Sequence, residues 1–205
     1  MTTYEVRPAA EDDVKAIIGL IDDAAQWLKE AKGEKAAGQW LKPWPDEAAR
    51  DARIRQGIQG GRTWMVLDND ILAGSVTYGR HGNPMLWNEK ELAQPAVYIS
   101  RLVVNRKHAK NGIGASLIDW AGRRGMRAWR AKWVRVDVWT LNHLLHEYYR
   151  NQGFRYLRTC PFENDWDYPS AALFQKPTAK LKSFAEGRFT ESPCQPRLMS
   201  TPTDL

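Results

Sequence analysis

Hydrophobic and polar positions along the first eighty residues follow a pattern that predicts a strand, two helices and a hairpin. Residues 4–7 have the alternation of a short strand, and apolar residues then recur at helical spacing from 14 to 28. The apolar positions of this first helix are Val14, Ile17, Ile18, Ile21, Ala25 and Leu28. A second helix is expected at about 46–56. The segments 63–67 and 71–78, joined by a polar turn, are typical of a β-hairpin.

The rest of the chain alternates strand and helix patterns after residues 80–95, which we expect to be a loop. Strands are predicted at 97–104, 134–140, 154–158 and 171–175. Helices are predicted after the first two of these strands, beginning near Ile113 and Asn142. After the last strand the residues include Ser, Thr, Pro and Lys with few large apolar side chains. We therefore expect residues 1–176 to form one α/β domain and 177–205 to be a flexible or peripherally docked tail.

The turn after the strand at 97–104 contains Gly112 and Gly114, separated by one residue, and leads directly into a helix. A strand that passes through such a turn into a helix leaves unpaired backbone N–H groups directed at one point. The helix dipole favours negative charge at the same place. The expected guest is a phosphate group, although a Gly-x-Gly pair alone is also typical of a purely structural tight turn.

A second motif lies in the next strand and helix. Asn142, Tyr149, Gly153 and Phe154 have the spacing of the pattern Asn-x-x-Ala-x-x-Leu-Tyr-x-x-x-Gly-Phe. Together with the glycine turn, this motif resembles the GCN5-related N-acetyltransferase (GNAT) superfamily, over residues 4–176. The resemblance implies an α/β (α+β) protein with the GNAT fold. Its features would be a central mixed, mostly antiparallel sheet of six to seven strands, about four flanking helices, and a splay at the acetyl-CoA site.

The resemblance also implies acetyl-CoA as the co-substrate and assigns residues to it. Backbone groups of Leu102, Val103 and Val104 would pair with the pantetheine arm like an added strand. Backbone amides of the glycine turn would hold the diphosphate. The residues of this turn are Lys110, Asn111, Gly112, Ile113, Gly114 and Ala115. Asn142 is either a cofactor contact or a helix N-cap. Ala109 stands where the family carries Arg or Gln, so one side-chain contact to the diphosphate is missing.

For catalysis the resemblance implies an acyltransferase in which a primary amine attacks the thioester directly. Such a reaction needs an unprotonated amine, a donor for the oxyanion and a proton for the departing thiolate. Tyr149 is the predicted proton donor, with a core aromatic residue as the alternative. Tyr148 points about 100° away around the helix, so only one of the two is expected to face the thioester. Many relatives carry a carboxylate where this chain has Tyr98, Ser100 and Arg101, so no general base is predicted and deprotonation through water is expected.

Two groups of residues are candidates for the acceptor site. The aromatic candidates are Trp27, Trp40 and Trp44, and the acidic candidates are Glu163, Asp165 and Asp167. The tryptophans surround the segment between the first two helices, where aromatic faces would hold an apolar or cationic group. The acids lie between the last two strands, where a negative rim would attract an ammonium group. Loop packing and solvated loop acids are the alternatives. A small-molecule amine, such as an antibiotic or a metabolite, is the favoured acceptor.

Charge and composition narrow the classes of protein. The net charge of +6 raises nucleic acid as a partner, but the basic stretch lacks interleaved stacking aromatics, so this role is not favoured. Cys160 and Cys194 are far apart and lack metal-ligand spacing, so neither a disulfide framework nor a metal site is predicted. The polar start of the chain and the lack of a run of roughly 18–20 apolar residues favour a cytoplasmic location without a membrane partner.

Two other functions stay open from the sequence. One is an acetyltransferase that acts on a protein or a charged tRNA, and the other is a non-catalytic module that binds acetyl-CoA. The sequence also leaves open whether the donor is acetyl or a longer acyl group, and whether the chain forms a homodimer.

Overall fold

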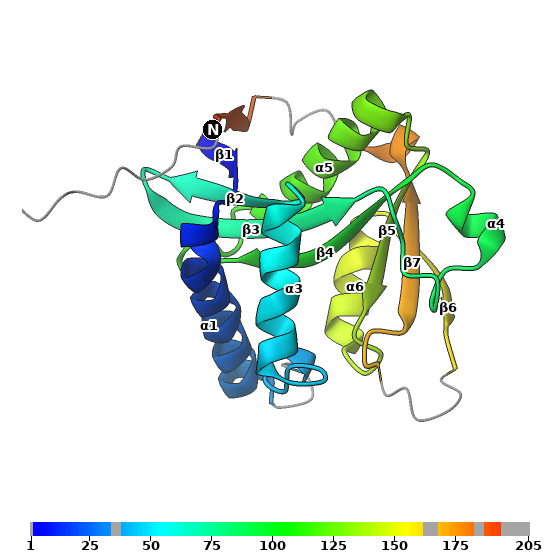
Figure 1. Ribbon diagram of the computed structural model, residues 1–205, viewed down its shortest axis with the longest axis horizontal. Helices are drawn as coiled ribbons and strands as arrows, with labels where there is room; N and C mark the ends of the chain where they lie inside the picture. Colours follow the sequence, from blue (N-terminus) through cyan, green and yellow to red (C-terminus); the bar gives the residue numbers. More distant parts are fainter. Residues whose placement is uncertain (1, 34–37, 162–167, 183–186, 194–205) are drawn as a thin grey trace, which may run out of the picture.

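The protein is built on one open sheet with helices on both faces (Figure 1). The computed structural model describes residues 2–33, 38–161, 168–182 and 187–193. In this part of the chain eight strands follow the order β6-β7-β5-β4-β3-β2-β1-β8. Their bounds are Tyr4–Pro8 (β1), Thr63–Asp68 (β2), Ile71–Gly79 (β3), Ala96–Val104 (β4), Trp133–Val138 (β5), Arg155–Thr159 (β6), Ala172–Pro177 (β7) and Phe189–Glu191 (β8). Neighbouring strands are antiparallel except in the pairs β4–β5 and β1–β8, so the predicted mixed, mostly antiparallel sheet is confirmed.

The long helices of the described part of the chain bury an apolar core on each face of this sheet. The bounds of the described α-helices are Val14–Lys32 (α1), Glu47–Gln59 (α3), Glu89–Leu92 (α4), Ile113–Trp129 (α5) and His143–Asn151 (α6). Helices α1 and α3 pack on one face, where Ile17, Ile54 and Met65 are buried together. Helix α5 packs on the other face, where Leu117 and Val66 share a core. Because Met65 and Val66 are neighbours on β2, the alternation of the strand supplies both cores. No helix in the described part of the chain is long and apolar enough to cross a membrane.

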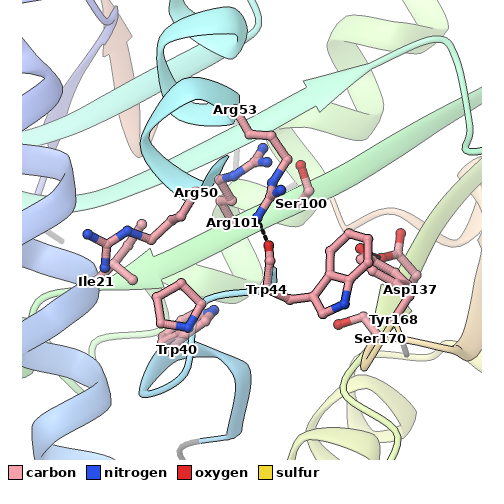
Figure 2. Close-up of a pocket in the computed structure, with 11 residues that line it drawn as sticks. Ile21, Trp40, Trp44, Arg50, Arg53, Ser100, Arg101, Asp137, Tyr168 and Ser170 are labelled. Atoms are coloured by element: carbon pink, nitrogen blue, oxygen red, sulfur yellow. Dashed lines mark hydrogen bonds between the residues drawn. The ribbon is translucent and has the colours of Figure 1, made fainter. Parts of the chain in front are cut away.

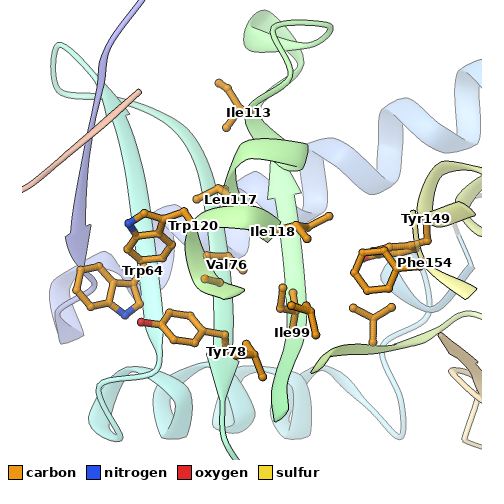
Figure 3. Packing of buried hydrophobic residues seen from close by; sticks show 14 of the residues in the cluster. Trp64, Val76, Tyr78, Ile99, Ile113, Leu117, Ile118, Trp120, Tyr149 and Phe154 are labelled. Carbon is orange, nitrogen blue, oxygen red and sulfur yellow. The ribbon is translucent and has the colours of Figure 1, made fainter. Parts of the chain in front are cut away.

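The core beneath α5 is rich in aromatic side chains (Figure 3). Trp120 of α5 makes edge contacts with Trp64 of β2 and Tyr78 of β3, with ring centroids 5.1 and 5.6 Å apart. At the other end of the same core, Tyr149 of α6 packs edge-on against Phe154, at 5.2 Å. Such contacts add about 0.5–1.5 kcal/mol each beyond burial of area. The core therefore links α5 and α6, the two helices that carry the predicted motifs.

Two elements differ from the sequence prediction. The sheet has eight strands instead of six to seven, because residues of the expected tail form β8 and pair in parallel with β1. No local pattern marks β8, since its pairing partner lies at the opposite end of the chain. The short helix α4 lies in the expected loop at 80–95. Asn88 and Glu91 form a capping box around it, which is how four residues become helical.

The predicted splay lies between β4 and β5. These parallel strands pair from Ala96 to Ile99 on β4, against Trp133 to Val136 on β5, and both continue beyond the last pair. A bulge in β4 follows at once, because Arg101 and Leu102 together stand opposite one residue of β3. Arg101 adopts a left-handed backbone with φ 48° within this bulge. The sheet therefore opens at its centre, and the splay is confirmed.

Candidate active site

The glycine turn forms the N-terminus of α5. Gly112 is the N-cap residue and has a left-handed backbone with φ 70°, which favours glycine. No side chain from the described part of the chain caps this helix end, so amides of its first turn are available to a ligand. A cavity of about 380 Å³ opens beside the turn, and we call it the glycine-turn cavity.

Most residues predicted to bind the cofactor line this cavity. They are Leu102, Val104, Lys110, Gly112, Ile113, Gly114 and Ala115. Val103 instead directs its side chain into the core under α1 and α3. Asn111 is exposed, and its carbonyl oxygen accepts a hydrogen bond from Arg188. Asn142 lines a neighbouring cavity and also accepts a 3.0 Å hydrogen bond from the backbone amide of Leu145, so it acts as the N-cap of α6.

A second cavity, of about 370 Å³, lies where β4 and β5 separate, and we call it the splay cavity. Ser100 and Arg101 of β4, Asp137 of β5 and Tyr149 of α6 are among the residues that line it. The residues that it shares with the glycine-turn cavity are Leu102, Arg106, Leu145, Tyr148 and Tyr149. The two cavities therefore adjoin, and an extended ligand held at the glycine turn would reach the splay.

A third and smaller cavity, of about 130 Å³, adjoins the splay cavity on the side of α1 and α3 (Figure 2). We call it the arginine cavity because Arg50, Arg53 and Arg101 line it. The residues that it shares with the splay cavity are Trp40, Ser100, Arg101 and Asp137. The three cavities thus follow one another from the glycine turn, through the splay, to the segment between α1 and α3.

The structure brings only part of the predicted acceptor site together. Trp40 and Trp44 both line the arginine cavity. Trp27 lies apart from the described lining, and its ring stacks under the guanidinium of Arg106, 3.2 Å from the ring centroid. Arg106 in turn lines the glycine-turn and splay cavities, so Trp27 supports the site from behind. The predicted acids lie outside the described residues. They are Glu163, Asp165 and Asp167.

Tyr148 and Tyr149 both line the glycine-turn and splay cavities. Both side chains therefore face the site, although they are separated around α6. Tyr149 is 7% exposed, and burial raises the pKa of its phenol above the ordinary value, with smaller effects from Tyr148 and Asp137. Burial also raises the pKa of Tyr148, to about 12. The Tyr148 hydroxyl lies beside the glycine turn, because a Cβ at Gly114 would be 2.8 Å from its oxygen. Both phenols are protonated at neutral pH.

Among the described residues that line the three cavities, Asp137 is the acidic one, and it was not predicted from the sequence. It follows Val136, the last β5 residue paired with β4, and lines both the splay and arginine cavities. Burial raises the pKa of its carboxyl group to about 6, although the Tyr168 hydroxyl donates a 3.1 Å hydrogen bond to it. At neutral pH this group is ionised and can accept a proton. Its alternation with valines in the strand pattern VRVDV was the available signal.

Arg188 belongs to the expected tail, yet it reaches the glycine turn. Its guanidinium donates hydrogen bonds to the carbonyl oxygen of Asn111 and, at 3.2 Å, to the hydroxyl of Ser116. One of its nitrogens is 3.4 Å from the place where a Cβ at Gly112 would stand. A cation at a helix N-terminus is unfavourable by itself and becomes favourable when an anion binds there. The sequence analysis missed Arg188 because it is far from the turn along the chain.

Known proteins and one family model match most of the chain. Residues 21–154 match the model of the acetyltransferase (GNAT) family. YesJ of Bacillus subtilis (strain 168), an uncharacterized N-acetyltransferase, is 26% identical over 153 residues, which are 73% of this chain and 81% of YesJ. A GNAT-family acetyltransferase of Listeria monocytogenes has a similar structure, with a TM-score of 0.64 at 24% identity over 85% of this chain and 94% of that one. YncA of Salmonella typhimurium, a putative acetyltransferase solved with its cofactor acetyl-CoA, has a TM-score of 0.55 at 16% identity over 86% and 95%.

A sheet whose strands separate beside a glycine turn at the N-terminus of a helix is the arrangement typical of GNAT-fold acyltransferases. The chain belongs to the GNAT family of acetyltransferases, as its motifs predicted, and it is an N-acetyltransferase. In the part of the chain that the structure describes, no three His, Cys, Asp or Glu side chains gather in a way that could hold a metal ion.

Proposed function

We propose that this enzyme transfers an acetyl group from acetyl-CoA to the primary amine of a small molecule. The observation that carries the proposal is the series of adjoining cavities, with Tyr149 and Asp137 among the residues of the central one. A donor bound along the glycine-turn and splay cavities would meet an acceptor bound in the arginine cavity beside these two side chains.

The residues around the glycine turn fit coenzyme A. The N-terminus of α5 offers backbone amides to the diphosphate, and a side chain at Gly114 would fill the space that the cofactor needs next to Tyr148. Backbone groups of β4 beyond Ile99 are not paired with β5, so they are available to the pantetheine arm and to the oxyanion. Bound there, acetyl-CoA would supply the activated acetyl group as its thioester.

The transfer forms an N–C bond and breaks the C–S bond of the thioester. The ammonium group of the acceptor must therefore lose two protons, the first before the attack and the second as the amide forms, and one proton must reach the departing sulfur. Asp137 accepts the first proton, because its carboxylate lines the cavity proposed for the acceptor. Tyr149 donates a proton to the departing sulfur, since its phenol lines the cavities proposed for the donor, and the second proton lost by the nitrogen restores the phenol. In this proposal Asp137 accepts the proton of the amine, a role that the sequence had assigned to a chain of water molecules.

The size of the arginine cavity supports a small acceptor. At about 130 Å³, it has room for a compact amine. The direct test is release of free thiol from acetyl-CoA by the purified protein with a panel of small primary amines. Each amine is paired with its N,N-dimethyl analogue, which cannot be acetylated and serves as the control.

Thiol release that depends on the primary amine, with the acetylated amine identified by mass spectrometry, supports the proposal. Transfer confined to peptides or charged tRNA would replace the small acceptor by a macromolecule. Acetyl-CoA binding without transfer to any amine, peptide or tRNA would make the protein an interaction module.

A side chain at Gly114 is expected to weaken acetyl-CoA binding. In Gly114→Val the new Cβ stands 2.8 Å from the Tyr148 hydroxyl, so the branched side chain occupies the entrance to the glycine-turn cavity. We expect Kd for acetyl-CoA, measured by calorimetry, to rise about 10-fold or more. Gly19→Val is the control, because this helical glycine has no atom within 4 Å of its added Cβ. Unchanged affinity in a folded Gly114→Val protein would place the phosphate site elsewhere.

Removal of the Arg188 guanidinium is expected to weaken acetyl-CoA binding as well. Arg188 holds the glycine turn through Asn111 and Ser116 and adds positive charge beside a proposed diphosphate site. We expect Arg188→Met to raise Kd for acetyl-CoA about 10-fold, the effect of one hydrogen bond to a charged group. Adding Ala109→Arg to this variant restores the guanidinium that the family pattern carries and should recover part of the affinity. Arg155→Met, an exposed arginine on β6, is the matched control. Equal Kd values in all four proteins would contradict the role of Arg188.

A further inference from the structure

We infer that the acceptor carries an acidic group, such as a carboxylate or a phosphonate, close to the amine that is acetylated. Arg101 and Arg53 would bind the acidic group, and Asp137 would receive the amine. This inference rests on the proposed N-acetyltransferase function and names its substrate class.

Arg101 is the first observation behind it. Its guanidinium lies between the splay and arginine cavities, and the described residues give it neither a hydrogen bond nor an ion pair. Burial lowers the pKa of Arg101, and repulsion from Arg53 lowers it further. The Asp137 carboxylate attracts Arg101 without a direct ion pair and offsets only part of the cost of burying this charge, so a bound carboxylate would remove more of it.

The backbone of Arg101 supports a functional role for its position. Arg101 has φ 48° inside β4, a left-handed conformation that is strained for a side chain other than glycine. The bulge at Arg101 and Leu102 produces this conformation at the point where β4 leaves β5. The strained backbone therefore lies at the residue whose guanidinium lines both cavities.

Arg53 of α3 adds a second positive charge to the same cavity. Its guanidinium donates a hydrogen bond to the carbonyl oxygen of Trp44 and lies 6.0 Å from the centroid of the Trp44 ring (Figure 2). Arg50 also lines the cavity but differs, because ion pairs of 2.8 and 2.9 Å with Asp22 and Asp51 neutralise its charge. Arg101 and Arg53 are therefore the two cations that an acceptor would meet.

The opposite side of the arginine cavity carries Asp137, with Tyr168 hydrogen-bonded to it (Figure 2). Besides the ion-paired Arg50, two guanidinium groups and one carboxylate of the described residues thus line a space of about 130 Å³. A molecule that fits there and satisfies all three has a negative and a positive group only a few bonds apart. The planar guanidinium of Arg matches a carboxylate or phosphonate through paired hydrogen bonds. A polyamine, in contrast, would place positive charge against Arg101 and Arg53.

The experiment compares acceptors that differ only in the acidic group. Thiol release from acetyl-CoA is measured with α-amino acids, with the amines that remain after their decarboxylation, with an aminoalkylphosphonate and with a linear triamine. We expect kcat/KM to be at least about 10- to 100-fold higher for the acid-bearing member of each pair, as for a charge-assisted contact. An aminoalkylphosphonate should also be accepted, and the triamine should be the poorest substrate.

Variants then assign the preference to the two arginines. Arg101→Gln and Arg53→Gln should each raise KM for the acid-bearing acceptor about 10-fold or more. KM for acetyl-CoA should be unchanged in Arg53→Gln, because Arg53 lines the arginine cavity and neither of the other two. Arg55→Gln is the control, because it removes the same charge from the same helix. The side chain of Arg55 is exposed and paired with Glu11 at 3.1 Å. If Arg101→Gln fails to fold, the acceptor pairs and Arg53→Gln still decide the matter.

The outcomes separate this inference from the proposed function. Acetylation of decarboxylated amines or of the triamine as efficiently as the acid-bearing acceptors would overturn the inference and leave the proposed function standing. Failure of every small amine would overturn both. A preference for acid-bearing acceptors that disappears in Arg101→Gln and Arg53→Gln, and persists in Arg55→Gln, supports it.

Discussion

Asp137→Asn is expected to remove most of the activity and, at the same time, to stabilise the folded protein above neutral pH. As the proposed proton acceptor, Asp137 should account for about 10² to 10⁴ in kcat/KM. In the unchanged enzyme, kcat/KM should rise with pH through about 6, because burial raises the pKa of this carboxyl group to about that value and only the ionised form accepts a proton. The pH profile of thiol release tests both expectations.

The effect on stability follows from the same raised pKa. A carboxyl group with a higher pKa in the folded state contributes stability that is complete below its ordinary value of 3.8 and is lost as pH rises through about 6. Ionised Asp137 therefore costs up to about 3 kcal/mol at pH 8, at about 1.4 kcal/mol for each pKa unit. Asp137→Asn should raise Tm by several degrees at pH 8 and much less at pH 4.

A second buried carboxylate provides the contrast. Asp119 forms a 2.8 Å ion pair with Lys176, and both side chains are 3% exposed. Asp119→Asn leaves the ammonium buried without its partner, so it should lower stability by about 3–5 kcal/mol. An Asp137→Asn protein that keeps full activity, or that loses stability as Asp119→Asn does, would contradict the role of Asp137.

Tyr149→Phe is expected to lower kcat by about 10² to 10⁴ with little change in acetyl-CoA affinity, because the phenol supplies the proton for the departing thiolate. Burial keeps Tyr149 protonated well above neutral pH, which a general acid requires. Tyr148→Phe is the matched comparison on the next residue of the same helix. Since the Tyr148 hydroxyl lies beside Gly114, its loss should change the affinity for acetyl-CoA more than kcat.

Steady-state kinetics and calorimetry on the two variants distinguish these roles. Equal losses of kcat in Tyr148→Phe and Tyr149→Phe would point to general packing of α6, since both rings line the same cavities. Full activity of Tyr149→Phe would leave solvent as the acid.

Most of the fold could be predicted because each main element carries its own pattern. The spacing of apolar residues marks α1, and two strand-like segments joined by a polar turn mark the hairpin of β2 and β3, so these elements differ from prediction only at their ends. The elements that escaped prediction depend on distant contacts. A 2.7 Å ion pair between Glu91 of α4 and Arg158 of β6 holds helix α4 in place. Strand β8 forms by pairing with β1. Neither contact is visible in a local stretch of sequence, although the capping box of Asn88 and Glu91 is a local signal for α4 that the expectation of a loop at 80–95 overlooked.

The candidate site divides in the same way. The donor side follows from residues close together in the sequence, namely the glycines and the register from Asn142 to Phe154. The acceptor side depends on the splay and the bulge, which decide that Asp137 and Arg101 face a cavity instead of neighbouring strands. Strand periodicity predicts which face a residue occupies but not where a sheet opens, so these residues could not be assigned from the pattern alone.

The pairing of β8 with β1 also affects how the sheet meets other protein molecules. A strand at the edge of a sheet exposes unpaired backbone groups that can recruit another chain and start aggregation. Here β8, with three residues, covers the five-residue β1 and leaves only a very short edge on that side. Because Arg188 directly precedes β8 and holds the glycine turn, a chain shortened to residues 1–176 would lose this protection together with the brace on the turn. Protection from self-association and support of the donor site thus depend on the same few residues.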